Sequence, residues 1–423
     1  MKMKLQKILS RFQKLHPKEI DLSLDRIKNL CKKLGNPQDN IQAISVVGTN
    51  GKNSTINAIF SILKEANFKC NAYISPHILK INERFIFNNK ELGDDELADL
   101  FNEIENINNN EPITFFEILT ACYFYKAAQF PDNINLIEAG LFHRFDATNI
   151  LKENLASVVT SISKDHLDWL EKDQQTIEKI VFEKTSTLLK SKIIVANQSS
   201  KKTMDCIKKT IYQNTSNKVF FNDDFSYSVG ENNFFYYEDK LGGLKLPMPN
   251  ILGQFQLENI STAIATLRNL DLEIKDEHIK RGITRISSLA RLQEIKSGKL
   301  KDLVKNNKLI IDGTHNEDGA RALNEYLQSL NCNKHIIISM MANKEHEKYI
   351  SYFKDVSSIT TIDLKTQPNS INGKDLKEKF KNMQNLKYQP SIEHAIKSID
   401  LKEGDLLLFT GSLYGAAEVL SLN

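Results

Sequence analysis

Cysteine is scarce in this sequence, and its five residues lie far apart. Cys31, Cys70, Cys122, Cys206 and Cys332 form no C-x-x-C spacing. This excludes the usual pattern of a zinc ribbon and of a dithiol redox motif. An odd, sparse set of cysteines fits a reducing compartment, so we expect a cytoplasmic protein.

Long hydrophobic runs are also missing. No apolar stretch approaches the ~20 residues that a membrane-spanning helix requires. In the N-terminal segment MKMKLQKILSRFQKLH, the apolar residues Leu5, Ile8, Leu9, Phe12 and Leu15 recur at helical spacing, but lysines interrupt them. This pattern predicts an amphipathic helix rather than a signal peptide. We expect no membrane partner.

The sequence has no excess of charge of one sign. Its 56 basic and 53 acidic residues give a net charge of +3, and they are interspersed. A nucleic-acid binder would show a concentrated basic face, so we expect no nucleic-acid partner. Internal repeats and low-complexity segments are absent as well. The length of 423 residues exceeds one ordinary core and predicts two domains.

Short apolar segments alternate with stretches of helical periodicity, which predicts a parallel sheet covered on both faces. The expected strands are residues 43–47 (AISVV), 134–138 (INLIE), 156–162 (ASVVTSI) and 192–196 (KIIVA), and the expected helices lie near 55–66, 114–128 and 175–190. Between 217 and 247, the segments FSYSV and FFYYE flank GENN and predict an antiparallel hairpin. Two further helices are expected near 256–270 and 276–286.

A second α/β series begins after residue 295. Strands are expected at 308–312 and 336–339, and residues 405–420 read as strand, glycine turn and helix. The predicted fold class is therefore α/β, with an N-terminal P-loop ATPase-type domain (residues 1–295) and a C-terminal Rossmann-like domain (residues 296–423). The N-terminal sheet is expected to be mostly parallel with a small antiparallel part.

The segment VVGTNGKNST, residues 46–55, follows an apolar strand and precedes a helix. That is the context of a phosphate-binding loop, because glycines let backbone N–H groups approach phosphates and the helix N-terminus adds a positive dipole. Lys52 would neutralise phosphate charge, and the hydroxyl of Ser54 or Thr55 would ligate Mg²⁺. The structural alternative is a glycine turn with a surface lysine.

Several other segments contain recognisable sequence motifs. They are SPHILKINERF (75–85), TFFEILTACYF (114–124), IEAGLFHRFDATN (137–149), KDHLDWL (164–170) and EKTSTLLK (183–190), followed by LGQFQLEN, RLQE, DGTHN and GSLYGAAEV. With the loop GTNGKNST, their order and spacing resemble the folylpolyglutamate and dihydrofolate synthases of the Mur ligase superfamily. The resemblance covers nearly the whole chain.

The resemblance implies roles for individual residues. The residues implied in ATP binding are Gly48, Thr49, Asn50, Gly51, Lys52, Asn53, Ser54, Thr55, Asn259, Arg291, Asp312 and His315. Two Mg²⁺ sites would use Ser54, Glu138, His166 and a carbamylated Lys184, and a monovalent cation is a further expected cofactor. Lys52, His166 and Lys184 are the implied catalytic residues. The implied substrate-binding residues are Ser75, His77, Glu83, Arg84, Phe116, Arg144 and Asp146.

Three of these roles have plain structural alternatives. Glu138 ends a buried strand on the side where ligands of open α/β sheets bind, but such a residue can also cap a neighbouring helix. His166 could be an ordinary surface histidine and Lys184 a solvated helix residue. A carbamate on Lys184 requires a desolvated amine whose lowered pKa lets it react with CO₂.

The resemblance implies an ATP-dependent amide ligase that adds L-glutamate to dihydropteroate and to folates. The substrate carboxylate would attack the γ-phosphate, and the glutamate amine would then displace phosphate from the acyl phosphate. The enzyme would supply positioning and charge neutralisation. We expect a monomer whose partners are these small molecules.

The chain departs from the family pattern at four places. Asn53 follows the loop lysine, Phe142 and His143 replace two glycines, Phe255 stands where histidine is common, and Ala290 replaces a glycine. Because paired glycines often mark a positive φ or a close backbone approach, these changes put substrate choice in question. The alternatives are a non-catalytic or substrate-shifted ATP-binding relative, and a cell-wall ligase. Only 47 residues precede Gly48, too few for the extra domain of the latter.

Overall fold

Strand and helix alternate through two compact units in the computed structural model. The structure describes residues 2–18, 21–231 and 233–423. The first unit comprises Met1–Asn250 with Leu257–Ile286, and the second comprises Ile251–Gln256 with Ser287–Asn423. None of the described helices combines the length and apolar character that crossing a bilayer needs. The predicted α/β class is confirmed.

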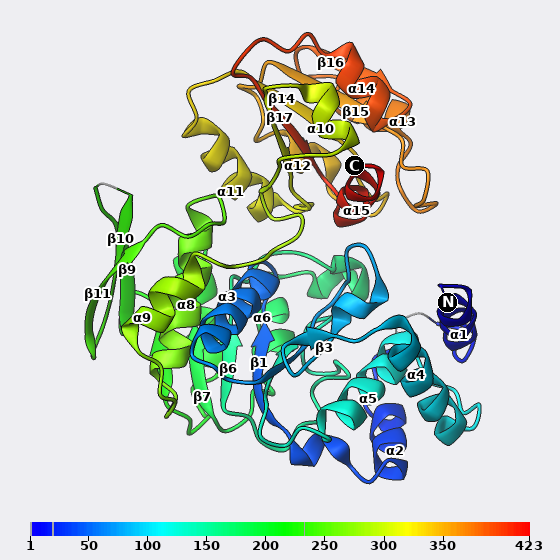
Figure 1. Ribbon diagram of the computed structural model, residues 1–423, viewed down its shortest axis with the longest axis vertical. Helices are drawn as coiled ribbons and strands as arrows, with labels where there is room; N and C mark the ends of the chain where they lie inside the picture. Colours follow the sequence, from blue (N-terminus) through cyan, green and yellow to red (C-terminus); the bar gives the residue numbers. More distant parts are fainter. Residues whose placement is uncertain (1, 19–20, 232) are drawn as a thin grey trace. The chain divides into compact units, whose positions relative to one another are not determined.

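The first unit is built on an eight-stranded sheet of order β4-β3-β2-β5-β1-β6-β7-β8 (Figure 1). Its strands are β1 (Gln42–Val47), β2 (Cys70–Tyr73), β3 (Phe85–Phe87), β4 (Lys90–Glu91), β5 (Ile134–Glu138), β6 (Ala156–Val159), β7 (Lys192–Val195) and β8 (Lys218–Phe220). The pairings of β2 with β3 and of β3 with β4 are antiparallel, and the others are parallel. In the parallel register, Val46 lies opposite Glu138 and Val47 opposite Val159. The loops that follow β1, β5 and β6 therefore leave the same edge of the sheet.

The helices of this unit are α1 (Lys2–Phe12), α2 (Asp25–Lys33), α3 (Lys52–Glu65), α4 (Asp94–Asn108), α5 (Phe115–Ala127), α6 (Ile177–Thr185), α7 (Lys201–Thr210), α8 (Phe255–Arg268) and α9 (Asp276–Ile283). The first residues of α8 fall within the segment assigned to the second unit. Local chemistry fixes two of the helix starts. Thr114 and Glu117 form a reciprocal capping box at α5, and the Thr176 hydroxyl accepts from the Lys179 N–H at α6.

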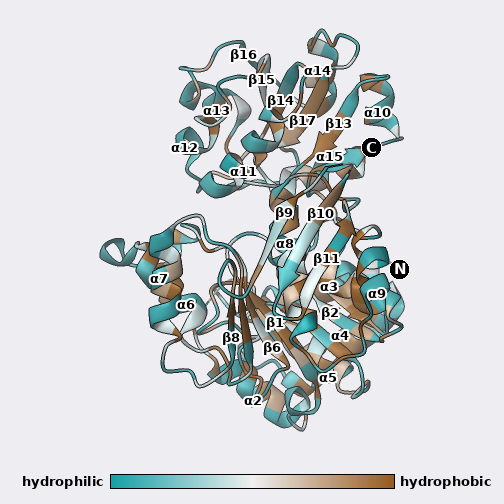
Figure 2. Ribbon diagram, turned by 90° about the vertical axis from the view of Figure 1, so that its left-hand side faces the viewer, coloured by the Kyte–Doolittle hydropathy of each residue, from teal (hydrophilic) through white to brown (hydrophobic). Residues whose placement is uncertain are grey.

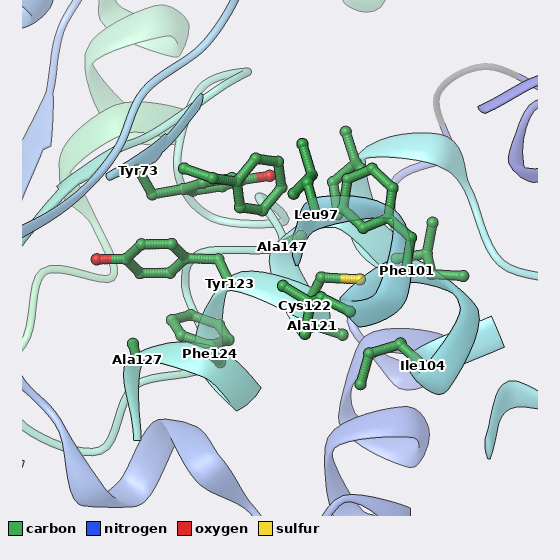
Figure 3. Close-up of a cluster of buried hydrophobic side chains, with 14 of the residues drawn as sticks. Tyr73, Leu97, Phe101, Ile104, Ala121, Cys122, Tyr123, Phe124, Ala127 and Ala147 are labelled. Atoms are coloured by element: carbon green, nitrogen blue, oxygen red, sulfur yellow. The ribbon is translucent and has the colours of Figure 1, made fainter. Parts of the chain in front are cut away.

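Two apolar clusters pack side by side on one face of this sheet. One cluster joins α1, α2, α4 and α5 to β2 and β3, with Phe101, Cys122 and Tyr123 at its centre (Figure 3). The other joins α6 and α7 to Val47 of β1, Val159 of β6 and two residues of β7. In Figure 2 the central strands are brown and the outer helix surfaces are largely teal, so apolar residues gather at the sheet. Both clusters lie on the face of β1 that carries Ala43 and Val47. The opposite face, which carries Ile44 and Val46, is also buried and lies against α3, as expected for parallel strands.

The predicted hairpin is present, but it belongs to a sheet of its own. Strands β9 (Phe225–Val229), β10 (Phe234–Asp239) and β11 (Gly242–Pro247) form a three-stranded antiparallel sheet. The predicted strand 156–162 ends earlier, at Val159. Its last residues turn away because their backbone groups bond the loop after β1.

The second unit holds a six-stranded sheet of order β12-β13-β17-β14-β15-β16. Its elements are β12 (Gln293–Ile295), α10 (Lys299–Val304), β13 (Lys308–Ile311), α11 (Glu317–Gln328), β14 (Lys334–Ile338), α12 (His346–Ile350), β15 (Ser358–Ile362), α13 (Gly373–Lys379), β16 (Leu386–Gln389), α14 (Ile392–Ser398), β17 (Leu406–Thr410) and α15 (Leu413–Leu422). Apart from β12, all its strands are parallel. Residues 294–302, where the domain start is predicted, contribute β12 and α10 to this unit.

Candidate active site

The phosphate-type loop joins β1 to α3 and has no room for side chains at two of its glycines. Gly48 has φ +148°, and a Cβ there would lie 2.0 Å from Thr160 Oγ1. Gly51 has φ +88°, and a Cβ there would lie 2.3 Å from Asn259 Oδ1. Left-handed backbone and close packing together restrict both positions to glycine. The structure also brings Asn259 to the loop, where the sequence predicts it.

Residues just beyond β6 hold this loop in place. The backbone N–H groups of Thr49 and Asn50 donate to Ser161 O at 2.8 and 3.2 Å. The Thr49 hydroxyl donates to Ser163 O and accepts from Ser163 N, both at 3.1 Å. Sequence reasoning missed these anchors, although the hydroxyl residues Thr160, Ser161 and Ser163 directly after a buried strand were a signal. The Thr49 side chain therefore serves the loop itself.

Lys52 and Glu138 meet at the edge where β1 and β5 end. The Lys52 ammonium donates to the Gly48 and Thr49 carbonyls, each at 3.2 Å, and lies 4.0 Å from Glu138 Oε1. Glu138 is buried, and its Oε2 accepts from the Ser75 backbone N–H at 3.1 Å. Three loops therefore converge on one carboxylate.

The first turn of α3 carries the predicted hydroxyl ligands. Ser54 and Thr55 are buried there. Asn53 lies beside them, and its Oδ1 accepts from the Asn57 side chain one turn further along the helix, at 2.9 Å. The Asn53 side chain therefore runs along α3, which answers how a bulkier residue fits after the loop lysine.

Lys184 is the most deeply buried charged group at this edge. Its side chain is 3% exposed, and its amine donates to Gly48 O at 2.9 Å. Burial, reinforced by the nearby Lys52 charge, lowers the pKa of Lys184 from 10.5 to about 7, although Asp165 and Asp146 oppose the change. A substantial fraction of this amine is therefore neutral at physiological pH.

His166 begins a short turn after β6, with φ +56°. Its Nε2 lies 3.9 Å from Asp165 Oδ2, and its side chain is 39% exposed. The Phe142 ring packs edge-on against the imidazole, with ring centroids 6.4 Å apart. The histidine is therefore accessible on one side and held by an aromatic ring on the other.

The donor set can be tested for its fit to a metal. Across residues 2–18, 21–231 and 233–423, no three His, Cys, Asp or Glu side chains form a ready metal cluster. The predicted set contains two such residues, Glu138 and His166, together with Ser54 and Lys184. Beside Glu138, the buried Ser75 hydroxyl has no hydrogen-bond partner in the described part of the chain. Oxygen donors around one carboxylate suit Mg²⁺, which needs few protein ligands.

The predicted substrate residues of the segment 75–85 are brought together, but with different tasks. Glu83 accepts from the backbone N–H groups of residues 78, 79 and 80 at 2.6–2.9 Å, so it shapes the loop. Arg84 Nε donates to His77 Nδ1 at 2.9 Å. Burial and the Arg84 charge lower the pKa of His77 to about 4. His77 is therefore neutral, with its proton on Nε2.

The other predicted substrate residues lie around the loop after β5. Phe116 stacks on Tyr73, and a Cβ on Gly140 would lie 2.8 Å from its ring. Arg144 forms two hydrogen bonds with Glu183 at 2.8 and 2.9 Å. Asp146 accepts from the backbone of residues 140, 141 and 148 and from the residue 148 hydroxyl. Arg144 and Asp146 are therefore engaged in building the loop.

Phe142 and His143 occupy the position of the expected glycine pair. Phe142 keeps a positive φ of +55° and is buried, with its ring centroid 5.4 Å from the Lys184 amine. His143 Nδ1 lies 3.1 Å from the Thr187 hydroxyl, and burial together with the Lys184 charge lowers its pKa to about 4. Phe142 therefore has the left-handed backbone that glycine favours, although its side chain is large.

In the second unit, Arg291, Asp312 and His315 gather at the carboxyl end of β13. Asp312 is 1% exposed and accepts from the Leu292 and Thr314 N–H groups at 2.8 and 2.9 Å. His315 Nδ1 lies 3.0 Å from Gly313 O. The backbone N–H of Gly313 donates to Ala290 O. Ala290 has φ +52°, so this replaced glycine also keeps its left-handed backbone.

Comparison with known proteins gives consistent matches. The Mur ligase middle domain model matches residues 46–267, and the model of the Mur ligase, glutamate ligase domain matches residues 298–413. The dihydrofolate synthase/folylpolyglutamate synthase of Bacillus subtilis (strain 168) is 29% identical over 94% of this chain and 94% of its own length. The structure of Escherichia coli FolC in complex with DHPP and ADP has a TM-score of 0.87 and 29% identity, covering 99% of this chain and 97% of its own. A Yersinia pestis bifunctional folylpolyglutamate synthase/dihydrofolate synthase, complexed with AMPPNP and Mn ion, has a TM-score of 0.86 and 25% identity, with coverage of 99% and 97%.

Proposed function

The chain belongs to the dihydrofolate synthase/folylpolyglutamate synthase branch of the Mur ligase family, and on this premise we propose that it adds L-glutamate to dihydropteroate and to folates. It is an ATP-dependent carbon–nitrogen ligase that requires a divalent metal. DHPP in the similar Escherichia coli enzyme supports a pterin-bearing carboxylate as the acceptor of glutamate.

One observation carries the assignment of the chemistry to this site. The carbonyl oxygen of Gly48 accepts from both Lys52 Nζ and Lys184 Nζ, and Lys52 lies beside Glu138. Three features thus meet near the Gly48 carbonyl: a phosphate-type loop, a carboxylate that suits Mg²⁺, and a buried reactive amine. A structural glycine turn needs none of these three.

The residues proposed to hold Mg²⁺ are Ser54, Glu138, His166 and Lys184, with the Ser75 hydroxyl beside them. Bound Mg²⁺ would neutralise phosphate charge during transfer. Glu138 contributes a preoriented carboxylate, because the Ser75 N–H fixes one of its oxygens. Lys52 brings a positive charge to the γ-phosphate as it leaves ADP, and the α3 N-terminus adds its dipole.

Lys184 is proposed to act as a carbamate. Its neutral amine would add to CO₂, forming one N–C bond and releasing one proton, so that R–NH₂ becomes R–NH–COO⁻. The lowered pKa of the lysine supports this reaction because only the free amine is nucleophilic. The carbamate nitrogen keeps one N–H, which can go on donating to Gly48 O.

The acceptor carboxylate would attack the γ-phosphorus of ATP, and ADP would leave. The glutamate amine would then attack the carbonyl carbon of the acyl phosphate, and phosphate would leave. Neutral His77, held by Arg84, offers an Nε2–H donor at the segment proposed to meet the pterin-bearing substrate. In the second unit, Arg291, Asp312 and His315 are proposed to contact the nucleotide.

We also propose that the protein is a cytoplasmic monomer and that a monovalent cation assists it. All five cysteines are free thiols, which fits a reducing compartment. Size-exclusion chromatography with light scattering would test the monomer, and a comparison of K⁺ with Na⁺ buffers would test the cation.

Phosphate release tests the function. Purified protein would be given ATP, Mg²⁺, L-glutamate and either dihydropteroate or tetrahydrofolate, and we expect release with both acceptors. Lys52→Ala serves as the control, with release expected to fall by at least about a hundredfold. Release that does not depend on a pterin acceptor would contradict the proposal, and release with one acceptor alone would restrict it to that reaction.

A further inference from the structure

Three consecutive residues after β5 contact the C-terminal end of α6 and the residues that follow it. The Phe142 ring lies over the Lys184 amine, and His143 Nδ1 lies 3.1 Å from the Thr187 hydroxyl. The Arg144 guanidinium binds Glu183 through two hydrogen bonds, and the Arg144 N–H donates to Glu183 O at 3.0 Å. The turn 142–144 is therefore held rigidly against the helix that carries Lys184.

Phe142 adopts a conformation that phenylalanine normally avoids. Its φ of +55° is left-handed, and its side chain is 4% exposed. A bulky residue persists in this region only where its surroundings over-determine the backbone, and such strain gathers at functional sites. The contacts of the turn with α6 supply that constraint.

The ring of Phe142 touches two of the proposed metal ligands at once. Its centroid is 5.4 Å from Lys184 Nζ, within the range of amine–aromatic contacts. It also lies 6.4 Å from the His166 imidazole centroid, at an interplanar angle of 74°. Such an edge-to-face pair favours one orientation of the imidazole over others.

We propose that Phe142 is a positioning residue for the metal site, rather than only a member of the apolar core. Its ring fixes the direction of the His166 imidazole and keeps the Lys184 side chain pressed toward Gly48. This role rests on the proposed function, because it assumes that His166 and Lys184 bind the metal. Mutation of side chains that orient metal ligands typically lowers metal affinity by about 10- to 100-fold.

The two readings of Phe142 predict different measurements. If the ring only fills the core, its loss lowers thermal stability and leaves metal affinity unchanged. If it orients ligands, its loss also weakens metal binding. Phe225 is a suitable control because it is a buried phenylalanine of the same unit, 3% exposed, whose ring contacts lie with Phe221 and Tyr237.

The test is isothermal titration of Mn²⁺ into the protein in the presence of ADP, alongside thermal melting. We expect Phe142→Leu to raise the Mn²⁺ dissociation constant by about tenfold or more. Phe142→Tyr, which keeps the ring, should bind within about twofold of the wild type. Phe225→Leu should lower the melting temperature and leave Mn²⁺ affinity unchanged.

Phe142→Gly provides a second route should the leucine variant not fold, because glycine accepts the positive φ without strain. It is expected to lose Mn²⁺ affinity in the same way as Phe142→Leu. Unchanged Mn²⁺ affinity in the folded leucine or glycine variant would overturn the proposal. Equal weakening in Phe225→Leu would overturn it too.

Failure of this inference is separable from failure of the ligase function. Wild-type protein that releases phosphate, with Phe142→Leu binding Mn²⁺ normally, refutes only the role of Phe142. Wild-type protein that binds Mn²⁺ but releases no phosphate refutes the ligase proposal, and the Mn²⁺ comparison then still decides the role of Phe142.

Discussion

Replacing Lys184 with methionine should stabilise the protein while it abolishes activity. The amine is buried, and its pKa is lowered from 10.5 to about 7. The unfolded chain therefore binds the proton more tightly than the folded chain, which costs folding free energy wherever the unfolded lysine is charged. Methionine has a similar length and carries no charge, so it removes this cost.

The magnitude follows from the two pKa values. Each tenfold change in proton affinity is worth about 1.4 kcal/mol, which gives a cost of roughly 4 kcal/mol at about pH 7.5. Losing the hydrogen bond to Gly48 O takes back about 1 kcal/mol, and Gly48 O still accepts from Lys52. The net gain is therefore roughly 3 kcal/mol, or a rise of several degrees in melting temperature.

The stability advantage of Lys184→Met should change with pH in one direction only. Below about pH 7 both states are protonated and the cost is complete, whereas above about pH 10.5 both are neutral and it vanishes. The advantage of Lys184→Met should therefore shrink as the pH rises from 7 toward 10. Thermal melting in CO₂-depleted buffer measures it, and Lys179→Met is the matched control because Lys179 pairs with Glu183 on the outer side of α6.

Two outcomes would refute this reasoning. A Lys184→Met protein less stable than the wild type at about pH 7.5 would show that the buried amine does not destabilise the folded state. Phosphate release that survives in this variant would show that Lys184 has no catalytic task. A gain of similar size in Lys179→Met would assign the effect to a general loss of charge.

Two further predictions concern other parts of the chain. Gly51→Ala should raise the KM for ATP by about tenfold or more, because the new Cβ would lie 2.3 Å from Asn259 Oδ1. Gly35→Ala is the control, because Gly35 has φ +82° and open space around its Cβ. This variant should leave the KM for ATP unchanged and lower the free energy of unfolding by only about 1 kcal/mol in a denaturant titration. Burial alone would raise the pKa of Asp405, but hydrogen bonds from the Lys402 backbone and two side chains outweigh it and hold the pKa below 3.8. Asp405→Asn should therefore be less stable than the wild type at about pH 6. The difference should shrink as the pH falls below 3.8, and melting curves across this pH range would show it.

Local pattern was enough to predict the frame of the site. The strand before Gly48, the helix after Gly51 and the strand that ends at Glu138 all follow from apolar periodicity and glycine chemistry, and each is present. These signals lie within a few residues of one another. The approach of Lys184 to Gly48 joins positions 136 residues apart, and only the family resemblance suggested it.

Other features of the site could not be predicted from any local sequence pattern. The pairing of Arg144 with Glu183, 39 residues away, could not be read from the sequence, although it takes up the Nε and Nη2 groups of the arginine. Phe142 and Ala290 looked like lost glycines, yet their backbones keep positive φ values of +55° and +52°. Composition cannot reveal this, because the surrounding contacts rather than the residue type hold the conformation.

The carbonyl of Gly48 is a single acceptor shared by two lysines, one from the phosphate loop and one from α6. A ligand that draws Lys52 away alters the electrostatic surroundings of Lys184, and a change at Lys184 alters those of Lys52. Coupling between two binding events is reciprocal by thermodynamic necessity. With the carbamate proposed for Lys184, any factor by which nucleotide changes the affinity of Lys184 for CO₂ would equal the factor by which CO₂ changes the affinity for nucleotide. The shared oxygen would then connect the supply of CO₂ to the occupancy of the loop.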